Sequence, residues 1–136
     1  MRVLIVENGA TQRQALAELL RDEGHEVAEA SCPSAALELF ANQPADVLLI
    51  NYVLADGEAP GLIEQVRALE TEAGRLPCDV VCISGATSVR MTTSGPVFDD
   101  YRDTCRRMGV AAFFPKPVDF ERLSDFLADR GSLRVA

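Results

Sequence analysis

Five short apolar runs recur along the chain, and longer amphipathic segments separate them. Each run has the length of a β-strand and is bounded by polar or turn-forming residues. The expected strands are Arg2–Val6, Glu26–Ala30, Val47–Ile50, Asp79–Ile83 and Ala111–Phe114. Strands that alternate with helical segments are typical of βαβ units, so the pattern predicts a doubly wound α/β fold with a parallel sheet.

The first two intervening segments carry local signals for helix ends. Thr11 and Gln14 have the spacing of a capping box at the start of the first helix, and Gly24 is expected to end it. Pro33 suits the first turn of the second helix, since proline there sacrifices no helical hydrogen bond.

The later helices are predicted from the spacing of their apolar residues. We expect them over about 62–73 and 98–108, and a last helix that Asp119 caps and that ends near Gly131. The segment Ser84–Pro96 is rich in Ser, Thr and Gly. We expect it to be either a disordered loop or a partner-binding surface, because long loops in small domains are often mobile or functional.

The length and charge narrow the class of protein. A chain of 136 residues holds one core, and we expect a domain over residues 1–131 with 132–136 as a tail or the start of a linker. The net charge of −8 disfavours direct binding to nucleic acid. No apolar run reaches the roughly 20 residues that span a bilayer, and the N-terminus lacks a signal-peptide pattern. We therefore expect a cytoplasmic protein without membrane contact.

The sequence gives little support for catalysis. Because the chain has a single histidine, His25, most arrangements of a nucleophile with a histidine base are excluded. The four cysteines are expected to be reduced and mostly buried. The turn at residues 7–11 has a single glycine instead of the spacing that cradles a nucleotide phosphate. We expect no enzyme, and a doubly wound small-molecule binder remains an alternative.

Polar residues follow four of the expected strands at their carboxyl ends, which meet at one edge of a parallel sheet. They are Glu7 and Asn8, Asn51, Ser84, and Lys116 with Pro117. In this order they resemble the receiver domain of two-component response regulators, over about residues 2–130. The resemblance implies the CheY-like, flavodoxin-like strand order 2-1-3-4-5. It also implies a cis peptide bond before Pro117.

In the receiver family an acidic pair, a phosphoacceptor aspartate, a Ser/Thr and a Lys-Pro line one crevice. Here Asn51 stands at the acceptor position and Asn8 replaces half of the acidic pair. An acyl phosphate cannot form on an amide. Mg²⁺ prefers carboxylates, so we expect no metal, or at most weak binding through Glu7, and no other cofactor.

The remaining polar residues are then expected to have a structural role. We predict that Lys116 pairs with Glu7 and that the two amides, Asn8 and Asn51, complete a hydrogen-bond network. The family's switch pair corresponds to Ser84 and Phe113, and the alternative for Phe113 is a core residue that packs inward.

The resemblance thus implies a degenerate receiver that signals through protein contacts without aspartate phosphorylation. An alternative is phosphorylation on a substitute carboxylate, Asp56 or Glu58. The family's usual face, formed by its fourth helix, fifth strand and fifth helix, corresponds to about 98–126. We expect a protein partner or a second copy to dock there, near Arg102, Arg106 and Arg107. The alternative for these arginines is a solvated helix face.

Overall fold

The main sheet has five parallel strands in the order β2-β1-β3-β6-β9. In chain order the five predicted strands correspond to β1, β2, β3, β6 and β9. The predicted strand order 2-1-3-4-5 is therefore confirmed. The computed structural model describes residues 1–51, 53–54, 57–84, 87–100 and 106–135. The strands are β1 (Arg2–Val6), β2 (Glu26–Ala30), β3 (Val47–Asn51), β6 (Asp79–Ser84) and β9 (Ala112–Pro115).

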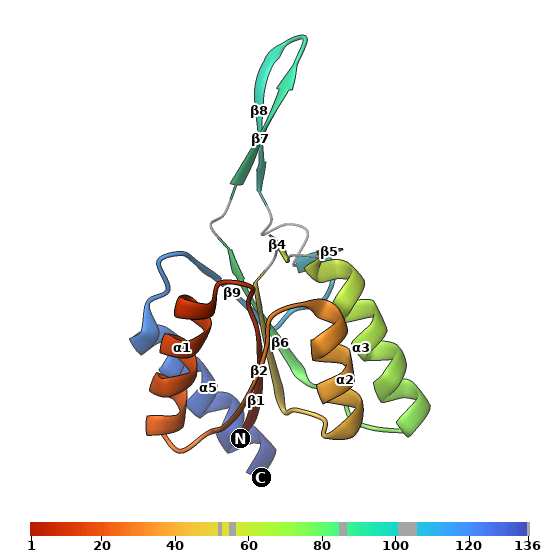
Figure 1. The fold of residues 1–136 in the computed structure, drawn as a ribbon, viewed down its shortest axis with the longest axis vertical. Coiled ribbons are helices and arrows are strands. Elements are labelled where there is room, and N and C mark those ends of the chain that lie inside the picture. The colour runs from red at the N-terminus through yellow and green to blue at the C-terminus, as the bar shows by residue number, and fades with distance from the viewer. Residues whose placement is uncertain (52, 55–56, 85–86, 101–105, 136) are drawn as a thin grey trace.

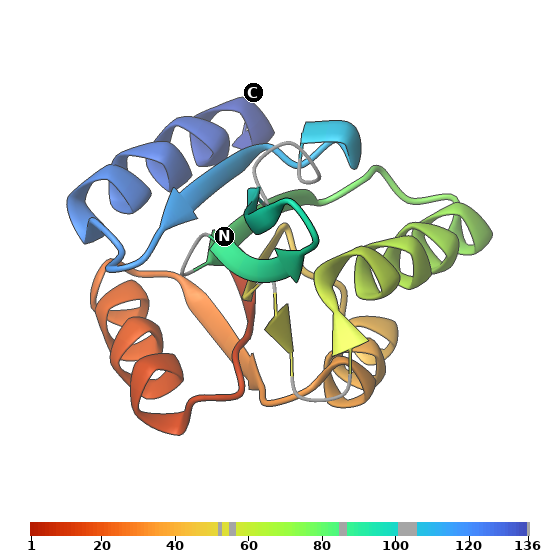
Figure 2. The same ribbon diagram turned by 90° about the horizontal axis from the view of Figure 1, so that it is seen from above.

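Helices cover both faces of this sheet (Figures 1 and 2). One face carries α1 (Ala10–Asp22) and α5 (Phe120–Val135), and the other carries α2 (Pro33–Asn42) and α3 (Ala59–Ala73). Because successive strand residues point to opposite faces, two cores result. Leu49 packs with α1 and α5, whereas Leu48 packs with α2 and α3. Burial on both faces explains why these strands are continuous apolar runs.

The helix ends confirm some of the sequence signals and correct others. Pro33 lies in the first turn of α2, and the backbone N–H of Arg122 donates to Asp119 Oδ1 at 3.2 Å, which confirms the cap of α5. The predicted capping box of Thr11 and Gln14 at the start of the first helix was wrong. Helix α1 begins at Ala10 with Gly9 as its N-cap and no side-chain cap, so Thr11 lies inside the helix.

Two helices are longer than the sequence predicted. Helix α3 begins at Ala59 instead of 62, which places Pro60 in its first turn, where proline is tolerated. Helix α5 continues past Gly131 to Val135. A Cβ at Gly131 would lie 3.6 Å from the Met1 side chain, so this turn packs against the start of the chain. Tertiary packing of this kind outweighs the low helix propensity of a single glycine.

The segment after β6 differs most from expectation. The strands β7 (Thr87–Thr92) and β8 (Gly95–Asp100) form an antiparallel hairpin that projects beyond the sheet (Figure 1). The helix predicted from Phe98 was therefore wrong at its start, because Phe98 pairs with Val89 across the hairpin. Residues 101–105 of that predicted helix lie outside the described residues, and a helical turn is present at Arg106 and Arg107.

A second small hairpin joins β3 to α3. It consists of β4 (Val53–Leu54) and β5 (Gly57–Glu58), which pair with each other and with no strand of the main sheet. Of the helices in the described part of the chain, none is long and apolar enough to cross a membrane.

Candidate functional site

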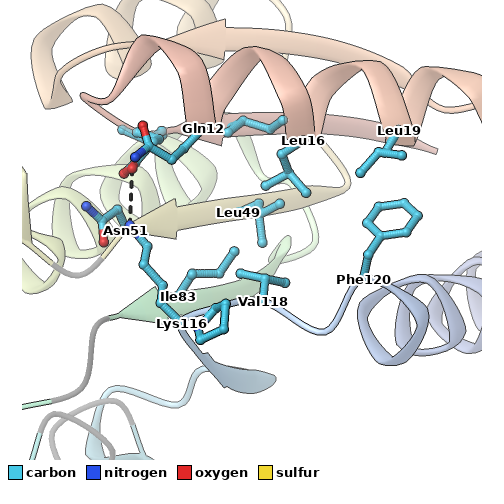
Figure 3. A pocket seen from close by; sticks show the side chains of 13 residues that line it. Gln12, Leu16, Leu19, Leu49, Asn51, Ile83, Lys116, Val118 and Phe120 are labelled. Carbon is cyan, nitrogen blue, oxygen red and sulfur yellow. Dashed lines mark hydrogen bonds and ion pairs between the residues drawn. The ribbon is translucent and has the colours of Figure 1, made fainter.

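A cavity of about 290 Å³ opens at the carboxyl edge of the sheet, between α1 and the connection from β9 to α5 (Figure 3). Its polar end is formed by Glu7, Gln12, Asn51 and Lys116. Its apolar walls come from α1, from the sheet and from the start of α5, and they include Leu16, Leu19, Leu49, Ile83, Val118 and Phe120. The cavity thus combines residues from elements far apart in the sequence.

Glu7 occupies the buried end of this site. It follows β1 and is 8% exposed. Its backbone N–H donates to the carbonyl of Ala30 at 3.0 Å, and Arg13 donates to its carbonyl at 2.9 Å. These bonds fix the backbone of Glu7 where β1 ends and the turn to α1 begins. The side chain therefore projects from a rigid position.

The predicted pairing of Glu7 with Lys116 is confirmed. Lys116 Nζ lies 3.1 Å from Glu7 Oε1, and the other carboxylate oxygen, Oε2, is buried without a hydrogen-bond partner. The peptide bond between Lys116 and Pro117 is cis, as the family resemblance implied. A carboxylate removed from water loses solvation, and one ion pair offsets that loss only in part.

The two amides differ in their placement. Asn51 is the last residue of β3, is half-buried and lines the cavity with Lys116 (Figure 3). Asn8 is exposed and does not line the cavity. The structure therefore brings Glu7, Asn51 and Lys116 together, and Asn8 is outside the cavity lining. The hydrogen-bond network of both amides stays a prediction.

The switch pair is described in part. Ser84 ends β6, where its backbone pairs with Pro115, but its side chain lies outside the described residues. Phe113 is half-buried and packs against the core under α2 and α3. This position favours the interpretation of Phe113 as a residue of the core.

Several other predicted positions are placed only in part. Arg106 and Arg107 are exposed, whereas Arg102 and Asp56 lie outside the described residues, as does the side chain of Glu58. Of the cysteines, Cys78 and Cys82 are buried and Cys32 is half-buried. The fourth cysteine, Cys105, lies outside the described residues.

The apolar part of the cavity was not predicted. None of Gln12, Leu16, Leu19 and Phe120 was among the candidate site residues. The available signal was the spacing of Gln12, Leu16 and Leu19, which places all three on one face of α1. That spacing shows a shared face, but it does not show that the face lines a cavity.

The fold and the site together define a class of protein. A five-stranded doubly wound domain with a carboxylate, an amide and a Lys-Pro at its carboxyl edge has the architecture of a signalling receiver. The family model for the response regulator receiver domain matches residues 3–128. The chain belongs to this family.

Individual relatives agree with that assignment. The chain is 32% identical over 124 residues to a response regulator receiver protein of Anaeromyxobacter sp. (strain Fw109-5), a match that covers 91% of this chain and 46% of the relative. It is 24% identical to the sensory/regulatory protein RpfC of Xanthomonas campestris pv. campestris, with 95% of this chain and 16% of RpfC covered. The chain thus spans less than half the length of these relatives.

Among solved structures, the receiver domain of the hybrid histidine kinase CckA is 26% identical, with a TM-score of 0.70. That match covers 96% of this chain and 98% of the CckA domain. The N-terminal domain of a Wolinella succinogenes protein has a TM-score of 0.77 at 21% identity and covers 99% of this chain and 97% of its own, which shows a shared fold.

Proposed function

We propose that this receiver domain signals through protein contacts without phosphorylation at the family's acceptor position. The observation that carries the proposal is Asn51, which ends β3 and lines the same cavity as Lys116. By the family resemblance, Asn51 corresponds to the acceptor aspartate, but its side chain is an amide. A carboxamide oxygen is a poor nucleophile and forms no acyl phosphate.

The metal requirement supports the same proposal. Receiver phosphorylation needs a divalent cation over the phosphoryl oxygens, and Mg²⁺ is usually bound through one or two carboxylates. Among the described residues that line the cavity, Glu7 is the one carboxylate, and Lys116 already engages one of its oxygens. No group of three or more His, Cys, Asp or Glu gathers anywhere in the described part of the chain. These residues do not fit the family's Mg²⁺ site.

The test is the intact mass of the protein after incubation with acetyl phosphate and Mg²⁺ and rapid acid quenching. We expect no phosphoryl adduct, with or without the metal. A Mg²⁺-dependent adduct would contradict the proposal. Peptide mapping would then show whether Asp56 or Glu58 acts as a substitute acceptor.

The proposed contact surface is the face built from β9 and α5, together with the turn that carries Arg106 and Arg107. Both arginines are exposed, and an acidic surface on a partner would complement them. We propose that a second copy of this chain, which carries a net charge of −8, docks there. Other acidic proteins are candidate partners for the same face.

Sedimentation velocity over a concentration series tests the contact with a second copy. We expect reversible dimers of the wild type and monomers of the double variant Arg106→Glu, Arg107→Glu. Arg75→Glu is the matched control, because Arg75 is an exposed arginine beyond the end of α3. Dimers that persist in the double variant, or a wild type that is monomeric throughout, would contradict the docking of a second copy at this surface.

A further inference from the structure

The cavity beside Glu7 opens to solvent at the carboxyl edge of the sheet, and a small ligand can enter it. This cavity has a volume of about 290 Å³, and most of its walls are aliphatic or aromatic, including Leu16, Leu49 and Phe120. Figure 3 shows these side chains facing one another across it. An apolar cavity of this kind is a poor site for ordered water.

Glu7, which lines the polar end of the cavity, has a buried carboxylate oxygen that lacks a partner. Glu7 is more than nine-tenths buried, and its Oε2 has no hydrogen bond. Buried polar atoms nearly always have a partner in native proteins, so an unpaired carboxylate oxygen calls for an explanation. The last torsion of a glutamate side chain is soft. A small rotation can therefore turn this oxygen toward a donor in the cavity without breaking the backbone bonds that hold Glu7.

We propose that this cavity binds a small, neutral, amphipathic molecule with a hydroxyl head and a compact apolar body. The hydroxyl donates to the Glu7 carboxylate, and the apolar body lies between Leu16, Leu49 and Phe120. A cavity of about 150 Å³ accommodates benzene. Twice that volume suits a ligand of about a dozen non-hydrogen atoms.

The charges at the polar end determine the head group. Glu7 and Lys116 form an ion pair, so the site as a whole is close to neutral. An anionic head would be repelled by the Glu7 carboxylate, and a cationic head would compete with Lys116 for it. A hydroxyl satisfies the unpaired oxygen without either conflict. This inference does not depend on whether the domain is phosphorylated.

The test uses three matched probes in titrations followed by two-dimensional ¹H–¹⁵N NMR. They are 4-propylphenol, propylbenzene, which lacks the hydroxyl, and 4-propylbenzoate, which is anionic. We expect saturable shifts with 4-propylphenol at the amides of Leu16, Leu49 and Val118. We expect the other two probes to bind about fivefold more weakly or worse, the factor that one net hydrogen bond contributes.

Variants separate binding in the cavity from binding elsewhere. Leu16→Trp and, independently, Val118→Trp fill the cavity, and each should abolish the shifts while the spectrum stays dispersed. Leu76→Ala removes a leucine that is 88% exposed and distant from the cavity lining, and it should change nothing. Glu7→Leu should remove the advantage of the phenol over propylbenzene.

Three results would overturn the proposal. The first is no saturable shift up to about 5 mM phenol, beyond the millimolar range in which weak specific binding is measured. The second is equal affinity for the phenol and propylbenzene, which would exclude the role of Glu7. The third is loss of phenol binding on addition of MgCl₂, which would show that Glu7 Oε2 binds a cation and not a hydroxyl.

Discussion

Lys116 Nζ lies 3.1 Å from Glu7 Oε1, although 109 positions separate the two residues in the chain. Their strands are not neighbours, because β3 and β6 lie between β1 and β9 in the sheet. The ion pair therefore crosses the carboxyl edge above two intervening strands.

The first prediction concerns the stability that this pair provides. Lys116→Met leaves the Glu7 carboxylate buried without a counter-ion, and we expect the free energy of unfolding to fall by about 2 kcal/mol. This value lies between those for exposed pairs and for broken buried pairs, because the lysine side chain is 34% exposed. Urea denaturation measures it. The double variant Glu7→Gln, Lys116→Met should regain part of the loss, and strictly additive effects would contradict direct coupling.

The second prediction concerns what the receiver chemistry lacks. Asn51→Asp restores a nucleophile but not the acidic pair, so we expect little or no phosphoryl adduct from acetyl phosphate. Asn8→Asp combined with Asn51→Asp supplies both carboxylates next to Glu7, and we expect an adduct that requires Mg²⁺. Intact mass spectrometry of quenched samples checks both variants. Equal labelling of the single and double variants would show that Asn8 is not part of the deficit.

The third prediction concerns pH. Burial, reinforced by the nearby Glu70 carboxylate, raises the pKa of the Cys78 thiol from 9.0 to about 12. The unfolded chain therefore loses this proton first, so stability is fully present below pH 9 and is lost as pH rises toward 12. The slope is at most about 1.4 kcal/mol per pH unit.

Urea denaturation between pH 8 and pH 10.5 compares the wild type with Cys78→Ala. We expect the difference in unfolding free energy between them to shrink above pH 9, because the variant lacks the titrating thiol. Lysines and tyrosines titrate in both proteins and cancel in the comparison. A difference that stays constant over this range would contradict the raised pKa.

The fourth prediction concerns the hairpin of β7 and β8. Its strands pair with each other and not with the main sheet, so the core does not depend on it. Replacing residues 87–100 with a short Gly-Ser linker should change the melting temperature by only a few degrees, which corresponds to less than about 1 kcal/mol in a domain of this size. Differential scanning calorimetry measures the change. A large loss of stability would show that the hairpin packs on the domain.

The sequence predicted the main sheet well because its strands are buried on both faces. Val47–Ile50 is continuous and apolar, and its short length between two helical segments favours a strand over a buried helix. The hairpin is different. Its two strands pair with each other, and no hydrophobic period in the sequence distinguished Phe98 as a strand residue. Pairing within an isolated ribbon leaves a weak trace in sequence.

The site was predicted only in part, because the fold determines which residues meet but not how their side chains pack. The pairing of Glu7 with Lys116 followed from the fold, since carboxyl ends of parallel strands meet at one edge. The cavity did not, because its volume depends on how Leu16, Val118 and Phe120 pack against one another. Residue spacing indicates the face on which a side chain lies, but it does not indicate how much space the opposing side chain leaves.

Met1 packs close to Gly131 in α5, at the end of the sheet opposite the cavity. The first residue and the last helix are thus neighbours, and the hairpin turn at Thr93 and Ser94 is exposed. The backbone could accordingly be rejoined at its ends and reopened at this turn to give a circular permutant. In such a protein the new termini would lie at the tip of the projecting hairpin, on the same side of the sheet as the Glu7–Lys116 crevice but beyond it, and a label could be attached there without altering the crevice.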